Sequence, residues 1–133
     1  GDFELTSTAN MFIDIAGTGS GEFDVFDIVG DATIAGGLAV DLLNGFQLDQ
    51  NQQFLFTNIG GNASGTFDGF GEGSVVFFDP GSGMDLFISY VGGNGNDIVL
   101  YTQTVPEPTT LLPLSLVIGG ISLRRRRKRN VGR

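Results

Sequence analysis

The sequence predicts an all-β domain over residues 1–104, built as a short right-handed parallel β-solenoid with a C-terminal β cap and followed by one short hydrophobic helix. Three observations support this class. Apolar and polar residues alternate with period two in short segments. Glycine accounts for 22 of 133 residues, against a usual share of roughly 7%, and separates these segments. No stretch before Val105 sustains an apolar period of 3.6 residues. A small β-sandwich or meander is the alternative, because it uses the same short strands.

The expected strands lie between glycine-bearing turns, which interrupt the alternation of apolar and polar residues. In chain order they cover residues 26–28, 32–34, 38–42, 54–56, 75–78, 84–91 and 98–100. Residues 26–42 have the tightest spacing and fit solenoid rungs best. Residues 44–100 have longer spacing and more Phe, which suits a terminal cap or a hairpin-like end. At roughly 20 residues per rung only about five rungs fit. Since the chain also begins at Gly1 without Met, we expect it to be part of a longer protein or a processed form of one.

The charges divide the chain into an acidic body and a basic end. All 15 Asp and Glu lie within residues 1–123, whereas all 7 Lys and Arg lie between Arg124 and Arg133. A body without cations repels phosphate groups, so nucleic acid is not an expected partner. The chain also has no Cys, His or Trp. These absences exclude a disulfide framework, a Cys/His zinc site and a Ser-His-Asp triad.

Residues 105–133 form a separate tail with three parts in a fixed order. Val105, Pro106, Glu107 and Pro108 are expected to be extended, because the two prolines fix their own φ and restrict the residue before each. Residues 109–123 are expected to form a hydrophobic helix. Its apolar stretch of residues 111–123 is about 20 Å long, short for a bilayer core of about 30 Å. A cationic stop follows at Arg124, Arg125, Arg126, Arg127, Lys128 and Arg129, and the positive-inside rule keeps it in the cytoplasm.

This order of parts resembles the PEP-CTERM protein-sorting signal. The resemblance covers roughly residues 105–129 and implies an exported protein that enters the inner membrane transiently through residues 109–123. It further implies a membrane exosortase as partner, with Pro106, Glu107 and Pro108 as recognition residues. Cleavage of the tail would then release the body to the cell surface or the extracellular matrix, where exopolysaccharide is a further expected partner. Two alternatives are a permanent single-pass anchor and a nucleic-acid signal formed by the Arg-rich end. The second alternative leaves the adjoining apolar run unexplained.

Residues 17–102 are more loosely similar to C-terminal segments of bacterial surface β-helix and autotransporter-like proteins. Three functions are therefore considered. The leading hypothesis is a non-catalytic exported surface or matrix protein. The second is the C-terminal part of a carbohydrate-active or adhesive β-helix protein. The third is a cation-binding matrix component, because a cation-free acidic body is expected to gain stability from salt or Ca²⁺.

Candidate sites within the body are few. Residues 92–100 match a calcium-binding nonapeptide in which Asp97 would supply oxygen ligands, but such sites use tandem copies and this chain has one. We therefore expect no cofactor, with Ca²⁺ at Asp97 as the alternative, and a glycine turn as the main interpretation. The Gly-rich residues 17–21 lack the following helix of a dinucleotide site. Two acidic pairs have the composition of a glycosidase site and are interpreted as surface charge: Asp24 with Asp27, and Asp79 with Asp85.

Overall fold

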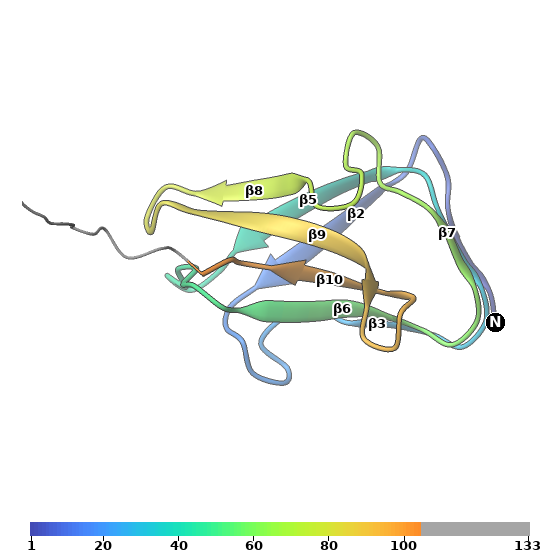
Figure 1. The fold of residues 1–133 in the computed structure, drawn as a ribbon, viewed down its shortest axis with the longest axis horizontal. Coiled ribbons are helices and arrows are strands. Elements are labelled where there is room, and N and C mark those ends of the chain that lie inside the picture. The colour runs from blue at the N-terminus through green and yellow to red at the C-terminus, as the bar shows by residue number, and fades with distance from the viewer. Residues whose placement is uncertain (105–133) are drawn as a thin grey trace, which may run out of the picture.

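Residues 1–104 are described by a computed structural model and contain ten β-strands and no helix (Figure 1). Within these residues there is accordingly no helix of the length and hydrophobicity that a membrane crossing requires. The expected helix over residues 109–123 lies outside the described part. The strands are β1 (Phe3–Leu5), β2 (Asn10–Ile15), β3 (Phe26–Ile28), β4 (Ala32–Ile34), β5 (Gly37–Leu42), β6 (Gln53–Ile59), β7 (Ala63–Gly65), β8 (Val75–Asp79), β9 (Met84–Gly92) and β10 (Asp97–Tyr101).

The strands form three sheets that mix parallel and antiparallel pairing. A three-stranded sheet has the order β1-β4-β7, and a two-stranded sheet pairs β2 with β5; both are parallel. The largest sheet has the order β3-β6-β10-β9-β8. In it β3 and β6 pair in parallel, while the pairs β6–β10, β10–β9 and β9–β8 are antiparallel. In Figure 1 this sheet lies in front of β2 and β5, and β7 lies at the end near the N-terminus.

The prediction of an all-β class is confirmed, but the predicted parallel solenoid is wrong. Three separate sheets, two of them parallel and one mixed and none of them closed, replace a regular coil of parallel rungs. The alternative of a small β-sandwich fits this arrangement. The physical reason is that β9 and β10 are joined by a tight glycine turn, which returns the chain antiparallel to itself. Period two places side chains inward or outward, but it does not specify the direction of the neighbouring strand.

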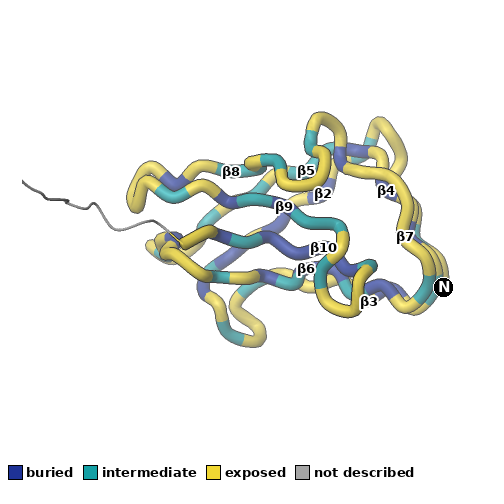
Figure 2. The backbone as a smooth tube through the Cα atoms, viewed as in Figure 1, coloured by how far each residue is buried: buried dark blue, intermediate teal, exposed yellow. Residues whose placement is uncertain are grey.

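The core lies between the sheets, and in several strands buried and exposed residues alternate. In β2, for example, Met11, Ile13 and Ile15 are buried while the residues between them are exposed. Figure 2 shows the same alternation of buried and exposed positions along the tube. The largest fully buried side chains are those of Phe54, Phe56, Phe67, Ile13, Ile15, Leu86, Ile88, Ile98, Leu100 and Thr57. All of these except Thr57 are apolar, so burial of apolar area supplies the main stabilising force.

Aromatic rings fill the centre of this core. The ring of Phe54 has edge-to-face neighbours in Phe23 and Phe46, with centroid distances of 5.5 and 6.2 Å. Phe67 stacks on Phe56 at 6.3 Å. The Tyr90 hydroxyl accepts a hydrogen bond from the Phe67 N–H at 3.0 Å, which holds the loop after β7 against the core. Edge-to-face and offset pairs of this kind stabilise beyond their buried area.

A ladder of turns stacks at the start of β1, β4 and β7. The three strands are preceded by the similar sequences Gly1-Asp2, Gly30-Asp31 and Gly61-Asn62. One carboxylate oxygen of Asp2 accepts the Asp31 N–H at 2.9 Å, and one of Asp31 accepts the Asn62 N–H at 2.8 Å. Each turn is thereby bonded to the next by a side chain and sets the register of the parallel strands.

The ladder explains two of the glycines. A Cβ on Gly30 would lie 2.1 Å from Asp2 Oδ1 and 3.0 Å from the Gly1 carbonyl oxygen. A Cβ on Gly61 would lie 2.2 Å from Asp31 Oδ1 and 2.7 Å from the Gly30 carbonyl oxygen. Both positions are therefore closed to any side chain, because the carboxylate of the previous turn and the backbone beneath it occupy the space.

We predict that Gly61→Ala destabilises the domain by about 1–3 kcal/mol, because the added methyl group must displace both the Asp31 carboxylate and backbone atoms. Gly71→Ala is the matched control, since a Cβ there meets nothing within 4 Å. Urea denaturation followed by circular dichroism measures both variants. Equal midpoints for Gly61→Ala and Gly71→Ala would contradict the proposed close approach.

Candidate functional site

The residues predicted to carry the sorting function lie outside the part of the chain that the structure describes. These are Val105, Pro106, Glu107 and Pro108 together with the cationic residues 124–129. Within residues 1–104, the buried charged side chains are those of Asp97 and Asp79, and they are the candidates for a functional site. Each of them closes a turn between strands, so their environments are described in order.

Asp97 begins β10 directly after the glycine turn that follows β9. Its side chain is 6% exposed, and Oδ1 accepts the Ile59 N–H of β6 at 2.8 Å. On the other side, a Cβ on Gly93 would lie 2.1 Å from Asp97 Oδ2, and Gly93 has a positive φ of 55°. The carboxylate thus lies between the turn and β6. The glycines let the backbone pass close to it.

The neighbouring residue fixes the same turn from a second direction. The Asn96 Nδ2 donates to the carbonyl oxygens of Ile59 and Gly61, at 3.0 and 2.5 Å. Asn96 and Asp97 together therefore join the β9–β10 turn to the end of β6. This geometry matches the main interpretation of residues 92–100 as a glycine turn that leads into the last strand. Within residues 1–104, no three acidic side chains gather in a way that would hold a metal ion.

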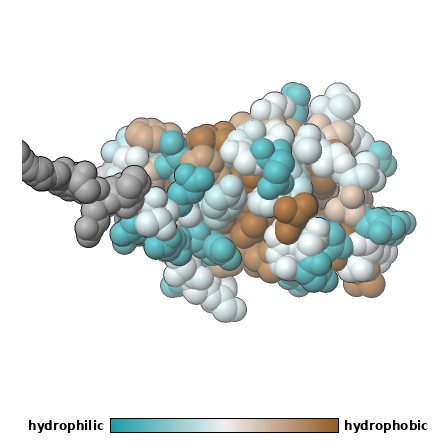
Figure 3. All heavy atoms as spheres, viewed as in Figure 1, coloured by the Kyte–Doolittle hydropathy of each residue, from teal (hydrophilic) through white to brown (hydrophobic). Residues whose placement is uncertain are grey.

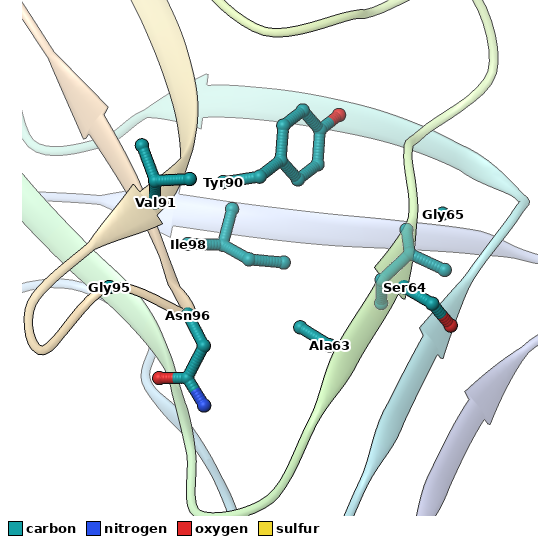
Figure 4. A pocket seen from close by; sticks show the side chains of 9 residues that line it. Ala63, Ser64, Gly65, Tyr90, Val91, Gly95, Asn96 and Ile98 are labelled. Carbon is teal, nitrogen blue, oxygen red and sulfur yellow. The ribbon is translucent and has the colours of Figure 1, made fainter.

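A hollow of about 250 Å³ lies between this turn and β7. Figure 4 shows Val91, Ile98 and Asn96 on one side of it and Ala63, Ser64 and Gly65 of β7 on the other. The Tyr90 ring also lines it, and its hydroxyl donates to the Phe70 carbonyl oxygen at 2.6 Å. Burial raises the pKa of the Tyr90 hydroxyl, and the nearby Glu72 carboxylate adds to this increase. Because this hydroxyl is already bonded within the loop, the hollow offers mainly apolar contacts.

Asp79 closes the turn between β8 and β9 and binds a distant loop. Its Oδ2 accepts the Leu48 N–H at 2.9 Å and the Ser82 hydroxyl at 2.8 Å, while Oδ1 accepts the Gly81 N–H at 2.9 Å. Burial by itself raises the pKa of this carboxyl, but the hydrogen bonds from Leu48, Ser82 and Gly81 outweigh it. The pKa of Asp79 is therefore below its ordinary value of 3.8.

Of the two acidic pairs considered from the sequence, all members but Asp85 accept hydrogen bonds within the fold, and the interpretation as surface charge is wrong for Asp79, which is buried. Oδ2 of Asp24 accepts the Asp14 N–H at 2.9 Å, and Oδ1 of Asp27 accepts from the Asn58 side chain at 2.8 Å. Asp79 is buried among hydrogen-bond donors, whereas Asp85 is exposed on β9. In the Gly-rich loop of residues 17–21, the Gly19 N–H donates to Glu22 at 2.8 Å. These carboxylates therefore accept hydrogen bonds from nearby groups, with the exception of the exposed Asp85.

The sequence interpretation missed the ladder formed by Asp2, Asp31 and Asn62. The signal for it was available, because Gly-Asp, Gly-Asp and Gly-Asn occur at residues 1, 30 and 61, each just before a short β-prone segment. The role of Asp79 had no such signal. Its partner Leu48 lies 31 residues away in a loop without a recognisable motif.

Comparisons of the chain with protein-family models, with curated proteins and with solved structures found no match. The function is therefore inferred from the residues of the chain and from the geometry of residues 1–104. Those residues define a small acidic β-domain whose buried carboxylates stabilise turns.

We predict that Asp97→Ala lowers the free energy of unfolding by about 1–3 kcal/mol, because the Ile59 N–H loses its buried acceptor. The loss is expected to be the same in EDTA and in millimolar Ca²⁺, since the carboxylate bonds to the protein itself. Thermal denaturation of the wild type and the variant in both buffers measures this. A wild-type midpoint that rises with Ca²⁺ and an Asp97→Ala midpoint that does not would instead indicate a calcium site.

We predict that Asp79→Asn destabilises the domain at pH 7 by about 1–3 kcal/mol, because an amide cannot accept all the hydrogen bonds that the carboxylate accepts. Since the pKa of Asp79 is lowered in the folded state, its contribution is complete well above pH 3.8 and is lost as the pH falls below that value. The difference between wild type and Asp79→Asn should therefore shrink in acid. Asp68→Asn, at an exposed position, is the control. A difference that is constant from pH 7 to pH 3 would contradict this.

Proposed function

We infer that residues 1–104 are the non-catalytic exported domain of a surface or extracellular-matrix protein, and that residues 105–133 are its sorting tail. The observation that carries this proposal is the order of the tail: Val-Pro-Glu-Pro, then an apolar run, then six consecutive cations. In this proposal a membrane exosortase recognises Pro106, Glu107 and Pro108. The tail enters the inner membrane, and cleavage releases the acidic domain to the outside.

The charge distribution supports this orientation. Residues 124–129 are all cationic and favour the cytoplasmic side of a membrane, whereas residues 1–123 contain no Lys or Arg that would oppose export. The domain also ends close to the proposed recognition site, because β10 ends at Tyr101 and Pro106 follows five residues later. A short connection of this kind would place the folded domain next to the membrane before cleavage.

The chemistry of the described domain supports a non-catalytic role. Its two buried acids each accept hydrogen bonds from backbone N–H groups, so neither is held ready for proton transfer. Without His in the chain, and without Lys before residue 128, the hydroxyl groups of the domain have no usual activating base. A cation-binding matrix component stays the second candidate, and the Ca²⁺ measurement described above for Asp97 tests it.

We predict that the mature surface form lacks the cationic end and that Glu107→Ala prevents its removal, because the recognition segment loses its only charge. Mass spectrometry of protein from the native cell surface locates the C-terminus. Asp68→Ala changes an exposed acid of the body and should leave processing unchanged. A surface form that still ends at Arg133 would refute cleavage, and normal processing of Glu107→Ala would refute recognition through this residue.

A further inference from the structure

The outer face of the five-stranded sheet is unusually apolar for a surface of an acidic domain. Leu86, Ile88 and Leu100 are fully buried, so alternation directs Phe87 and Tyr101 to the opposite face. In Figure 1 this face is turned toward the viewer, with β2 and β5 behind the sheet. In Figure 3 hydrophobic side chains lie in the middle of the same view, interspersed with hydrophilic ones. The solvent-exposed face of an antiparallel sheet commonly carries polar residues, whereas this face carries aromatic and aliphatic ones.

The centre of the face is a row of side chains that crosses four strands. Val75 of β8 is the register partner of Phe87, Phe87 is the partner of Tyr101, and Tyr101 is the partner of Gln53 in β6. The rings of Phe87 and Tyr101 stack with a centroid distance of 5.5 Å and an interplanar angle of 25°. Val75 is 43% exposed. The row thus consists of a stacked, half-buried aromatic pair with an exposed aliphatic side chain at one end and an amide at the other.

The strands hold this row rigidly. Thr102, next to Tyr101, is buried, and its hydroxyl both donates to the Asp49 carbonyl oxygen at 2.5 Å and accepts the Gln52 N–H at 2.9 Å. β10 is also paired on both sides, with β6 and with β9. The aromatic pair therefore stands on a central strand, where little ordering is needed on binding.

Polar groups surround the aromatic row without any cation. Ser89, two residues beyond Phe87 on β9, pairs with Val99, and the exposed Asp85 pairs with Phe78. These groups and Gln53 offer hydroxyl, carboxylate and amide hydrogen bonds. With no Lys or Arg in residues 1–123, the face has nothing that would attract an anionic polymer. A neutral ligand rich in hydroxyl groups suits this combination.

The size of the row favours a chain-like ligand over a protein. Three strand spacings give about 14 Å across the sheet, and the four steps from Phe87 to Val91 give about 14 Å along it. The resulting area of roughly 200 Å² is well below the about 800 Å² per partner that a stable protein interface uses. A second copy would also bring another acidic body close to this one.

We propose that this face binds a neutral, β-linked polysaccharide, whose sugar rings with equatorial hydroxyls lay their C–H faces on the solvent-facing part of the stacked Phe87 and Tyr101 pair. Gln53, Ser89 and Asp85 would hydrogen-bond the hydroxyl groups at the ring edges. This inference deepens the proposed function. It rests on that function in one respect, which is that export places the domain where it meets a glycan. The binding itself needs only the folded domain.

The test is calorimetric titration of the full chain, in a mild detergent, with cellohexaose. We expect binding by the wild type and about tenfold weaker binding, or none, by Phe87→Leu and Tyr101→Leu, equivalent to about 1.4 kcal/mol or more. Leucine keeps an apolar side chain but removes the flat ring. Phe12→Leu is the control, because Phe12 is an exposed ring on β2, outside the five-stranded sheet. Circular dichroism verifies that each variant is folded.

Three results would overturn the proposal: no cellohexaose binding by the folded wild type, unchanged affinity in both Leu variants, or equal binding of polygalacturonate, which is anionic. If sedimentation shows a wild-type dimer that the Phe87→Leu variant does not form, the face binds a second copy of the chain, and the glycan proposal is overturned as well. None of these results depends on processing of the tail, so failure here leaves the sorting proposal to be judged by the C-terminus of the surface form.

Discussion

The absence of cations from the body is the constraint on which the rest of the structure depends. Residues 1–123 contain no Lys or Arg, so their carboxylates have no side-chain counterion there. The fold uses backbone N–H groups in their place. Asp2 and Asp31 join successive parallel turns, Asp79 and Asp97 close the turns around β9, and Glu72 accepts the Tyr90 N–H at 2.7 Å. Charge-assisted hydrogen bonds of this kind are stronger than bonds between neutral groups.

This use of carboxylates also connects the acidity of the domain with its glycine content. A carboxylate that bonds to a neighbouring turn lies directly against that backbone. At Gly30, Gly61 and Gly93 the space for a Cβ is taken by the carboxylate of Asp2, Asp31 and Asp97, respectively. At these three positions the acid and the glycine are needed together, because each such contact requires a carboxylate and a residue without a side chain.

The same charge distribution unites the proposed functions of the two parts. A cation-free body is compatible with export and with a neutral glycan, whereas the cationic residues 124–129 suit the cytoplasmic end of a membrane segment. The aromatic pair of Phe87 and Tyr101 then stands on the outer face of the five-stranded sheet. In this interpretation the tail determines where the protein goes, and the outer face determines what it contacts there.

The sequence alone determined the all-β class and most of the strands, because alternation and glycine spacing are local features; for residues 105–133 it supplies the order of apolar and charged segments. Alternation at Met11, Ile13 and Ile15 would also have revealed β2, which was overlooked. Strand β7, by contrast, is Ala-Ser-Gly and has no signal; it forms because the Asn62 turn is bonded to the Asp31 turn. Only the tertiary structure decided the directions of pairing and the role of Asp97, whose partner lies 38 residues away. A period of two specifies the face that a side chain occupies, but the neighbouring strand is selected by contacts between distant parts of the chain.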